Sequence, residues 1–319
     1  MMRQSIELNT KNVPIIKKKK NIEGKKMFLY ILPFLILSFA FSYFPLYGWI
    51  YAFFDYKPPL NLSQCDFVAL KWFKMLFTNP TQVKQLVKVL LNTFAISGLG
   101  LATSFLPVFF AILLNEIRVK WFKKIVQTLT TLPNFISWVM VFSAAFSLFS
   151  ATGMVNSLFM DLGIISQPIK FLDGDSHTWL AMLAWSTWKG LGWGAIMYLA
   201  AIASIDQELY EAARVDGAGR FRLMRHITLP ALLPTFFVLA MLSIANFLNN
   251  GLDQYYVFQN SFNKQHIQVL DLYVYNIGIG GGRSPSLATA IGMLKSIVSV
   301  SLLAAVNLLS KKVRGESII

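Results

Sequence analysis

The sequence predicts an all-α membrane protein with six transmembrane helices, and its composition and its long uncharged runs support that prediction. Hydrophobic residues make up 55% of the 319 residues and charged residues 14%, against about 25% charged in an average soluble domain. Several runs reach the roughly 20 apolar residues that a helix needs to cross a bilayer. No regular alternation of polar and apolar residues indicates a β-barrel. So little polar surface argues against a soluble globular enzyme.

The six spans are placed where long runs carry either no charge or a single lysine. The third run is expected to hold one span and an extracytoplasmic loop, and the fourth and sixth contain Lys189 and Lys295. The runs are Met27–Phe54, Val89–Asn115, Ile125–Met160, Thr178–Ala203, Pro230–Asn249 and Pro285–Leu309. The first run is too long for a signal peptide and has no small-residue cleavage site, so we expect it to be retained.

The net charge of +14 predicts the orientation of the chain. Nineteen of the 29 lysines and arginines precede the first span, or lie in the second loop, the fourth loop or the tail. The positive-inside rule places these parts, including both termini, in the cytoplasm of a bacterial cell. We therefore expect a basic segment at 1–26, a membrane domain at 27–310 and a tail at 311–319. The first 26 residues contain no aromatic residue, which favours contact with anionic lipid headgroups over nucleic acid.

The predicted cytoplasmic loop at 204–230 has a helical pattern of its own. Most helix connections have about two to eight residues, so its length is unusual. Ser204 and Gln207 fit a capping box at the start of a first helix. Gly217 and Gly219 would end that helix, and a second short helix would run up to Pro230.

One face of the first short helix is suited to a protein partner. Leu209, Ala212 and Ala213 lie at positions i, i+3 and i+4, so they share a face. The small alanines allow another protein to approach closely, which is typical of a helix that docks in a groove.

The same loop resembles the EAA loop of permease subunits of binding-protein-dependent ABC importers. The matching segments are Glu211-Ala212-Ala213, Asp216-Gly217-Ala218 and Ile227-x-Leu229-Pro230. Four further segments are similar to the carbohydrate-importer permeases that handle oligosaccharides and polysaccharide fragments: 188–193, 198–201, 249–254 and 288–295. The resemblance covers roughly 27–309. It implies the type I ABC importer permease fold, with a coupling helix between the fourth and fifth spans.

The resemblance also implies which residues dock on a separate ATPase. These are Leu209, Tyr210, Glu211, Ala212, Ala213, Asp216, Gly217 and Ala218. Glu211 would pair with a basic ATPase residue, and Gly217 would keep the turn. The chain lacks the G-x-x-x-x-G-K-[ST] phosphate loop, so ATP and Mg²⁺ are expected on that partner. We expect no catalytic residue, cofactor or metal site on this chain.

The resemblance implies an assembly in which this chain supplies half of the pathway. The partners would be a second permease subunit, two ATPase subunits, an extracytoplasmic solute-binding protein and a sugar substrate. A heterodimer of permeases is expected, and a homodimer remains open.

The first candidate for the solute path lies in the fourth span. Trp185, Lys189 and Trp193 share one helical face, and Trp188 lies beside them. Indole rings stack on sugar rings, and the lysine can bind hydroxyls or carboxylates. The alternative is that the tryptophans pack between helices and that Lys189 pairs internally. Gly190 and Gly194 favour it as a small-residue packing face.

The second candidate is a polar cluster at the end of the fifth span. It consists of Asn246, Asn249, Asn250, Asp253, Gln254 and Tyr255. The alternative role is capping of the carbonyl groups at the end of that span. Asp253 is also a possible partner for Lys189 or Lys295.

An ion-gradient-driven secondary transporter is the alternative function. That class usually places carboxylates within its spans to bind coupling ions, and the expected spans contain no Asp or Glu. A membrane-embedded enzyme would need clustered histidines or carboxylates. The single cysteine and three histidines of this chain do not supply such a cluster.

Overall fold

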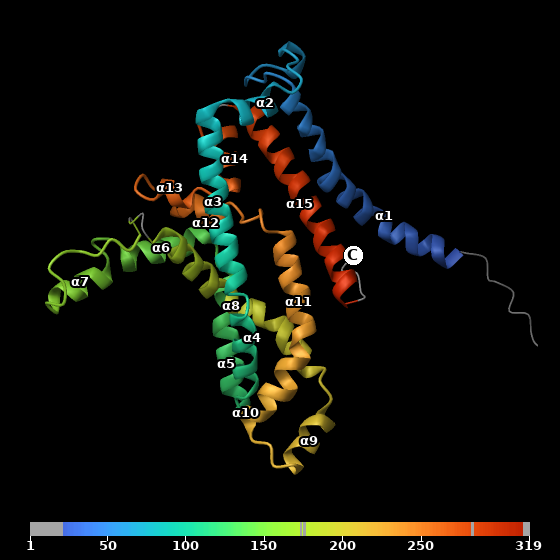
Figure 1. Cartoon of the computed structure of the whole chain (residues 1–319), viewed down its shortest axis with the longest axis vertical. Helices are drawn as coiled ribbons and strands as arrows, with labels where there is room; N and C mark the ends of the chain where they lie inside the picture. Colours follow the sequence, from blue (N-terminus) through green and yellow to red (C-terminus); the bar gives the residue numbers. More distant parts are fainter. Residues whose placement is uncertain (1–21, 173, 175–176, 282–283, 315–319) are drawn as a thin grey trace, which may run out of the picture. The chain divides into compact units, whose positions relative to one another are not determined.

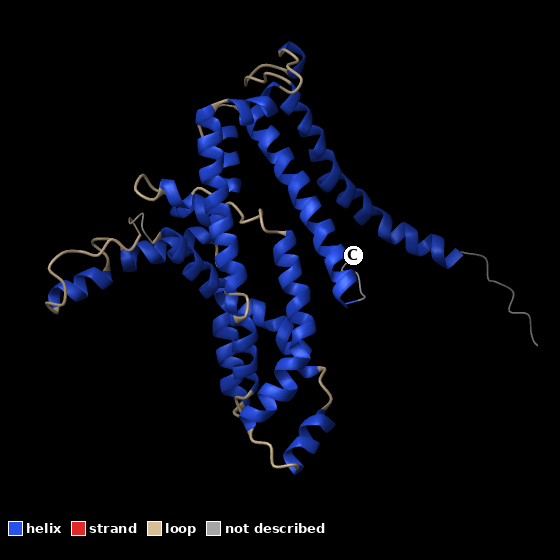
Figure 2. Ribbon diagram, viewed as in Figure 1, coloured by secondary structure: helices blue, strands red, loops and turns tan. Residues whose placement is uncertain are grey.

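The computed structural model describes residues 22–172, 174, 177–281 and 284–314. These residues form helices and loops, and among them no strand occurs beyond an isolated bridge between Phe54 and Phe67 (Figure 2). The chain divides into two compact units, Met1–Trp49 and Ile50–Ile319. Most of the basic segment expected at 1–26 and of the tail expected at 311–319 lies outside the described residues.

The first unit is built around one long apolar helix, α1 (Ile22–Tyr43). A 3₁₀ helix, η1 (Phe44–Phe53), follows it and crosses into the second unit. From 24 to 49 no residue is buried, and Phe34 and Phe41 are 72% and 78% exposed. A helix that is apolar on all sides is suited to a lipid or protein environment. α1 with η1 therefore corresponds to the first predicted span.

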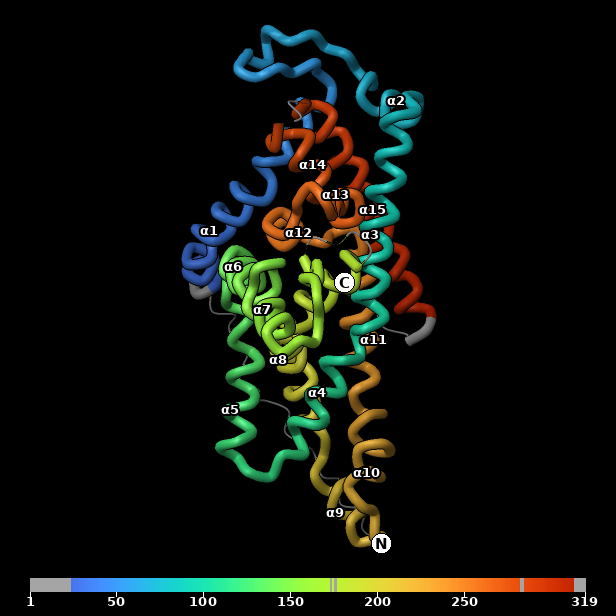
Figure 3. Tube along the Cα trace, turned by 90° about the vertical axis from the view of Figure 1, so that its left-hand side faces the viewer, coloured from blue at the N-terminus to red at the C-terminus, as the bar shows by residue number. Residues whose placement is uncertain are grey.

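The second unit contains the other elements of the described chain (Figure 1). They are η2 (Leu62–Gln64), α2 (Lys71–Thr78), α3 (Pro80–Ala102), α4 (Leu106–Asn115), α5 (Lys120–Thr131), η3 (Leu132–Phe135), α6 (Trp138–Phe149), α7 (Met154–Asp161), α8 (Thr178–Ala203), α9 (Gln207–Val215), α10 (Arg220–Leu223), η4 (Met224–Thr228), α11 (Leu229–Ala245), α12 (Asp253–Phe258), α13 (Lys264–Ile267), α14 (Leu270–Gly278) and α15 (Pro285–Arg314). Within this unit, α9 and α10 lie at one end and α2 lies at the other (Figures 1 and 3).

Five helical stretches of the described chain are long and apolar enough to cross a membrane. They are Gly24–Phe53, Pro80–Asn115, Trp138–Asp161, Arg220–Ala245 and Pro285–Lys312. Each overlaps one predicted span, whereas α8, at the fourth predicted span, is not among them. α8 has 26 residues, which is long enough to cross a membrane, and Lys189 is its single charged residue. It packs on α3, α4, α5 and α11, so less of its surface would face lipid. The six-helix count remains a prediction.

The third uncharged run is broken rather than continuous. The structure divides it into α5, η3, α6 and α7. Pro133 lies in η3, where its missing N–H prevents α5 from continuing. The side chain of Ser137 then accepts a hydrogen bond from the N–H of Met140 at 3.4 Å and starts α6. This break lies against α8.

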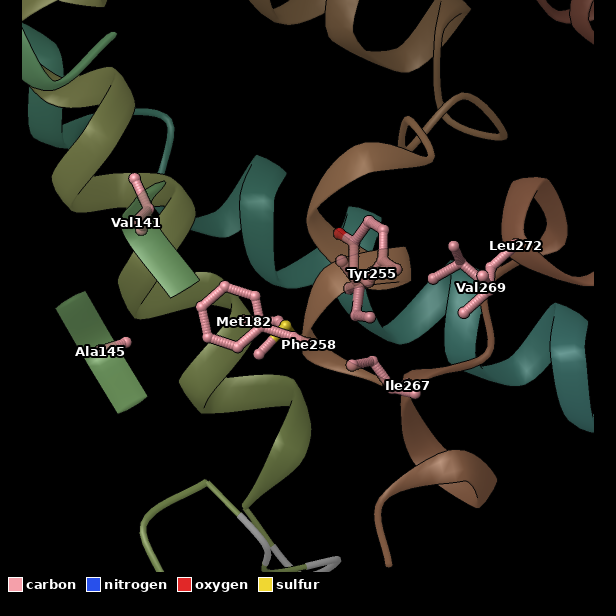
Figure 4. Packing of buried hydrophobic residues seen from close by; sticks show 9 residues of the cluster. Val141, Ala145, Met182, Tyr255, Phe258, Ile267, Val269 and Leu272 are labelled. Carbon is pink, nitrogen blue, oxygen red and sulfur yellow. The ribbon is translucent and has the colours of Figure 1, made fainter. Parts of the chain in front are cut away.

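Three clusters of buried apolar side chains hold the second unit together. In the first, Val141 and Ala145 of α6 and Met182 of α8 pack with Phe258 of α12 and Ile267 of α13 (Figure 4). The second joins α4, α8 and α11, and the third joins α2, α3, α14 and α15. α8 contributes to two of them. It is therefore the central helix of this unit.

The closest packing on α8 occurs at Gly192. A Cβ at Gly192 would lie 2.3 Å from the carbonyl oxygen of Thr130, whereas one at Gly190 would meet nothing within 4 Å. At Gly194 the nearest atom is Cγ of Pro107, at 3.2 Å. Within the described chain, the expected packing face is therefore used at Gly194, against α4, and not at Gly190, while α5 packs on the opposite side of α8 at Gly192.

Candidate functional site

The cytoplasmic loop predicted at 204–230 folds as a helical elbow made of α9, α10 and η4. The Oδ1 atom of Asp206 accepts a hydrogen bond from the N–H of Glu208 at 3.0 Å and caps α9. Ser204, the expected cap, instead donates its hydroxyl to the carbonyl oxygen of Ala201 at the end of α8. The expected start of the helix was therefore wrong by two residues, because Ser204 still belongs to the last turn of the preceding helix.

Gly217 ends α9 through a left-handed turn. Its φ angle is +76°, a conformation that only glycine adopts without strain. The N–H of Gly217 bonds the carbonyl of Arg214 at 3.0 Å, and that of Ala218 bonds the carbonyl of Ala213 at 2.9 Å. This pair of hydrogen bonds is a Schellman motif. The backbone thus reverses over two residues and positions α10.

The elbow is tied to the following membrane helix by one side-chain contact. The hydroxyl of Tyr210 on α9 lies 2.9 Å from Oγ1 of Thr228, which is the last residue of η4, directly before α11. Thr228 is buried, and Tyr210 is half-buried. Tyr210 therefore faces its own chain, whereas we had expected it to face a partner.

The other predicted docking residues form a mostly exposed face. Leu209, Glu211, Ala212, Asp216 and Gly217 are exposed, and Ala213 and Ala218 are half-buried. Two apolar side chains outside the predicted docking set are also exposed on the elbow: Val215 is 88% exposed and Phe221 is 72% exposed. A phenylalanine between two arginines, in a loop predicted to be cytoplasmic, was the signal that could have identified Phe221.

A groove of about 490 Å³ separates the elbow from the loop between α4 and α5. Its walls carry charges of both signs, from Glu116 and Arg118 on one side and Arg214 and Arg220 on the other. Lys123 donates to Oδ1 of Asn115 at 3.1 Å and holds the first wall in place. The elbow therefore has both an apolar and a charged surface.

The side chain of Lys189, on α8, reaches the break between α5 and α6. Its Nζ donates a hydrogen bond to the carbonyl oxygen of Asn134 in η3 at 2.7 Å and lies 5.4 Å from the centre of the Trp138 ring. The lysine thus satisfies a carbonyl left without a helical partner by the break. Both contacts are internal, as in the alternative given above. Neither neutralises the charge of the ammonium group.

The three tryptophans of this group have different surroundings. The Trp185 ring packs against Phe149 and Phe258, each with its centroid at 5.9 Å, and against Trp188 at 6.0 Å. Trp188 is 49% exposed and Trp193 is 51% exposed. Trp185 is therefore a packing residue, whereas the other two present open ring surface.

The polar cluster at the end of the fifth span divides into two groups. Asn246, Asn249 and Asp253 are exposed, and Asn249 donates to Oδ1 of Asn246 at 3.2 Å. The remaining three residues are used internally. Asn250 donates to Oγ of Ser97 at 2.8 Å, buried Gln254 donates to the carbonyl oxygen of Met182 at 2.8 Å, and Tyr255 is in the buried cluster of Figure 4.

Lys295 is neutralised within the chain by a residue that the sequence analysis did not single out. It forms an ion pair with Asp271 of α14, not with Asp253. The two residues are 24 positions apart, and only the packing of α14 on α15 brings them together. An acidic residue between apolar segments was the available signal. Among the described residues no group of three His, Cys, Asp or Glu side chains is placed to hold a metal ion.

Comparison with known proteins identifies the family of this chain. The sequence pattern of the binding-protein-dependent transport system inner membrane component family matches residues 84–315. The chain belongs to this family. The permease is 40% identical over 296 residues to protein LplB of Bacillus subtilis (strain 168), covering 92% of this chain and 91% of LplB.

Two further relatives carry names that state a substrate. The permease is 39% identical over 308 residues to the polygalacturonan/rhamnogalacturonan transport system permease protein YteP of Bacillus subtilis (strain 168), covering 94% of this chain and 92% of YteP. It also matches a chain in the crystal structure of a bacterial alginate ABC transporter in complex with an alginate pentasaccharide-bound periplasmic protein. That match has a TM-score of 0.80 at 29% identity and covers 94% of this chain and 98% of the other. The chain is therefore a multi-pass membrane permease subunit of an ABC importer.

Proposed function

We propose that this permease carries an acidic oligosaccharide from an extracytoplasmic binding protein into the cytoplasm. The observation that supports an acidic substrate is the setting of Lys189. Its contacts, a carbonyl oxygen and an indole ring, are both neutral, so its positive charge remains available to a carboxylate. Polygalacturonan and alginate, named for two similar proteins, are polymers of sugar acids. The neighbouring Trp188 offers exposed ring surface for a sugar ring.

The elbow supports docking of a separate ATPase. Leu209 and Val215 of α9 and Phe221 of α10 are exposed. These two helices lie at the end of the unit that the charge distribution predicts to be cytoplasmic (Figure 1). Large exposed apolar side chains beside charged ones are typical of a protein interface. Movement of α9 would reach α11 through the contact between Tyr210 and Thr228. ATP and Mg²⁺ would bind to the ATPase.

The assembly would contain a second permease subunit, two ATPase subunits and the extracytoplasmic binding protein, with both termini of this chain in the cytoplasm. Reconstitution in vesicles tests the proposal. Binding protein loaded with oligogalacturonate is expected to stimulate ATP hydrolysis, whereas a neutral oligosaccharide of equal length is not. Equal stimulation by both would contradict an acidic substrate. Uptake driven by an ion gradient without ATP would contradict the importer itself.

Variants of Lys189 test its role directly. Lys189→Met removes the charge, and we expect about tenfold or greater loss of acidic-oligosaccharide uptake, because a hydrogen bond to a charged group contributes about 1.5–3 kcal/mol. Lys189→Arg keeps the charge and is the matched control. Equal uptake by the methionine and arginine variants would show that Lys189 only fills the helix break.

A further inference from the structure

Asp271 is the centre of a polar network that connects four parts of the second unit. Its Oδ1 pairs with Lys295 of α15. Its Oδ2 accepts hydrogen bonds from the N–H of Asn250 at 3.1 Å and of Gly251 at 3.2 Å. Asn250 in turn donates to Ser97 of α3. One carboxylate on α14 is therefore linked to α15, to α3 and to the corner that follows α11.

This corner, residues 249–251, lies where α11 ends and the chain turns toward α12. Gly251 has a φ angle of +79°, so the turn is compact. It carries exposed Asn249 and leads to exposed Asp253, two of the candidates for the solute path. The side chains of Lys295 and Asp271 are only 15% and 20% exposed. An ion pair shielded in this way is weakly screened by salt and favours one arrangement.

The side-chain oxygen of Asn250 disfavours the observed conformation of the corner. The Oδ1 atom of Asn250 is buried and accepts no hydrogen bond in the described part of the chain. A buried acceptor without a donor costs free energy. The two hydrogen bonds to Asp271 oppose this cost.

We propose that Asp271 is a positioning residue for solute transfer, acting by holding the corner after α11 through its two backbone hydrogen bonds. Lys295 keeps the carboxylate in place and neutralises it. The consequence for transport rests on the proposed function, whereas the hold on the corner is a property of this chain alone.

Two double variants with the same net charge as the parent separate the effect of the two backbone hydrogen bonds from the effect of the ion pair. Asp271→Asn with Lys295→Met removes both charges and keeps an amide oxygen that can accept from the corner. Asp271→Leu with Lys295→Met has the same net charge and a side chain with the same number of heavy atoms and the same branching, but no acceptor. If the leucine variant does not insert, Asp271→Ala with Lys295→Met replaces it.

The first measurement is the mobility of a spin label placed in the corner of the full chain. Cys65 is the only cysteine, so Cys65→Ser with Asn249→Cys provides a single site for a nitroxide spin label. In membranes we expect a mobile label in the leucine variant and a label as restricted as in the parent in the asparagine variant. Equal mobility in both would overturn the hold. This result does not depend on any partner.

The second measurement uses unlabelled protein reconstituted with its partner subunits. We expect about a tenfold loss of ATP hydrolysis stimulated by loaded binding protein in the leucine variant, as for a typical coupling free energy. The asparagine variant should stay within about twofold of the parent, and basal hydrolysis should be equal in both. A mobile corner with unchanged stimulation would overturn the role in transfer. If the parent itself shows no stimulation, the proposed function fails, and the spin label still decides the hold.

Discussion

The elbow of α9 and α10 and the central helix α8 place polar groups in opposite ways. The hydrogen bonds to the backbone that shape the elbow join residues within five positions of each other. The N–H of Glu208 bonds the side chain of Asp206, and the N–H of Ala218 bonds the carbonyl of Ala213. On and around α8, two buried or half-buried polar groups find partners far away in the chain: Lys189 bonds Asn134, and Gln254 bonds Met182. The charge pattern predicts that the elbow lies outside the membrane, where its side chains can remain exposed to water. Inside a membrane a polar group must find a protein partner.

Local hydrogen bonds therefore shape the elbow of this permease, whereas long-range packing places the polar groups around α8. Substitutions at two glycines should separate the effect of local backbone conformation from the effect of helix packing. At Gly217 the backbone conformation is decisive, and at Gly192 the space beside the helix is decisive.

The largest effect is expected from Gly217→Pro. Proline requires a φ angle near −65°, whereas Gly217 has +76°, so the turn that positions α10 cannot form. We expect ATP-coupled uptake to be abolished while the protein remains inserted in the membrane. Uptake assays together with a membrane-fraction blot check this outcome. Gly219→Ala is the control, because its φ of −74° suits alanine and a Cβ there meets nothing within 4 Å.

A charge reversal at Glu211 tests whether the exposed surface of the elbow docks on a partner. Glu211→Lys leaves the backbone unchanged and reverses the charge of an exposed side chain, so we expect uptake to be lost without loss of insertion. Wild-type uptake by this variant would contradict docking of the elbow on an ATPase.

A smaller effect, on stability, is expected from Gly192→Ala. The added methyl would lie 2.3 Å from the carbonyl oxygen of Thr130, which forces α5 and α8 apart. Overpacking of this kind costs about 1–3 kcal/mol, seen as a lower midpoint of thermal unfolding in detergent. Gly190→Ala is the matched control, because its Cβ meets nothing within 4 Å. Equal midpoints for the two variants would show that α8 is not tightly packed on this side.

The smallest effect is expected from Tyr210→Phe. It removes one hydroxyl that lies 2.9 Å from Oγ1 of Thr228, and a neutral hydrogen bond contributes about 0.5–1.5 kcal/mol. We expect a few-fold decrease in transport per ATP hydrolysed. Thr228→Val breaks the contact from the other side. A double variant no worse than either single one would confirm that the two hydroxyls act together, whereas additive losses would contradict the link between α9 and α11.

Much of the fold and part of the site were predictable from the sequence. Apolar runs predicted five stretches that the structure contains as long apolar helices, because the length and hydrophobicity of a span are local properties. Glycine at 217 predicted the end of α9 for the same reason. The partner of Lys295 was not predicted, because it depends on which helices pack together. The break at Pro133 was not predicted either, although a proline inside the run was a local signal for it.

The sequence by itself determined the class of protein, the family and the position of the elbow. Each of these depends on composition or on short motifs such as 211–218. Only the tertiary structure decided that Lys189 fills a helix break, that Tyr210 faces Thr228 and that Asp271 holds the corner after α11. The physical reason is that a buried polar group is stabilised by whichever partner packing brings within hydrogen-bonding distance. That partner can be close in the chain, as in the elbow, or more than 50 residues away, as for Lys189.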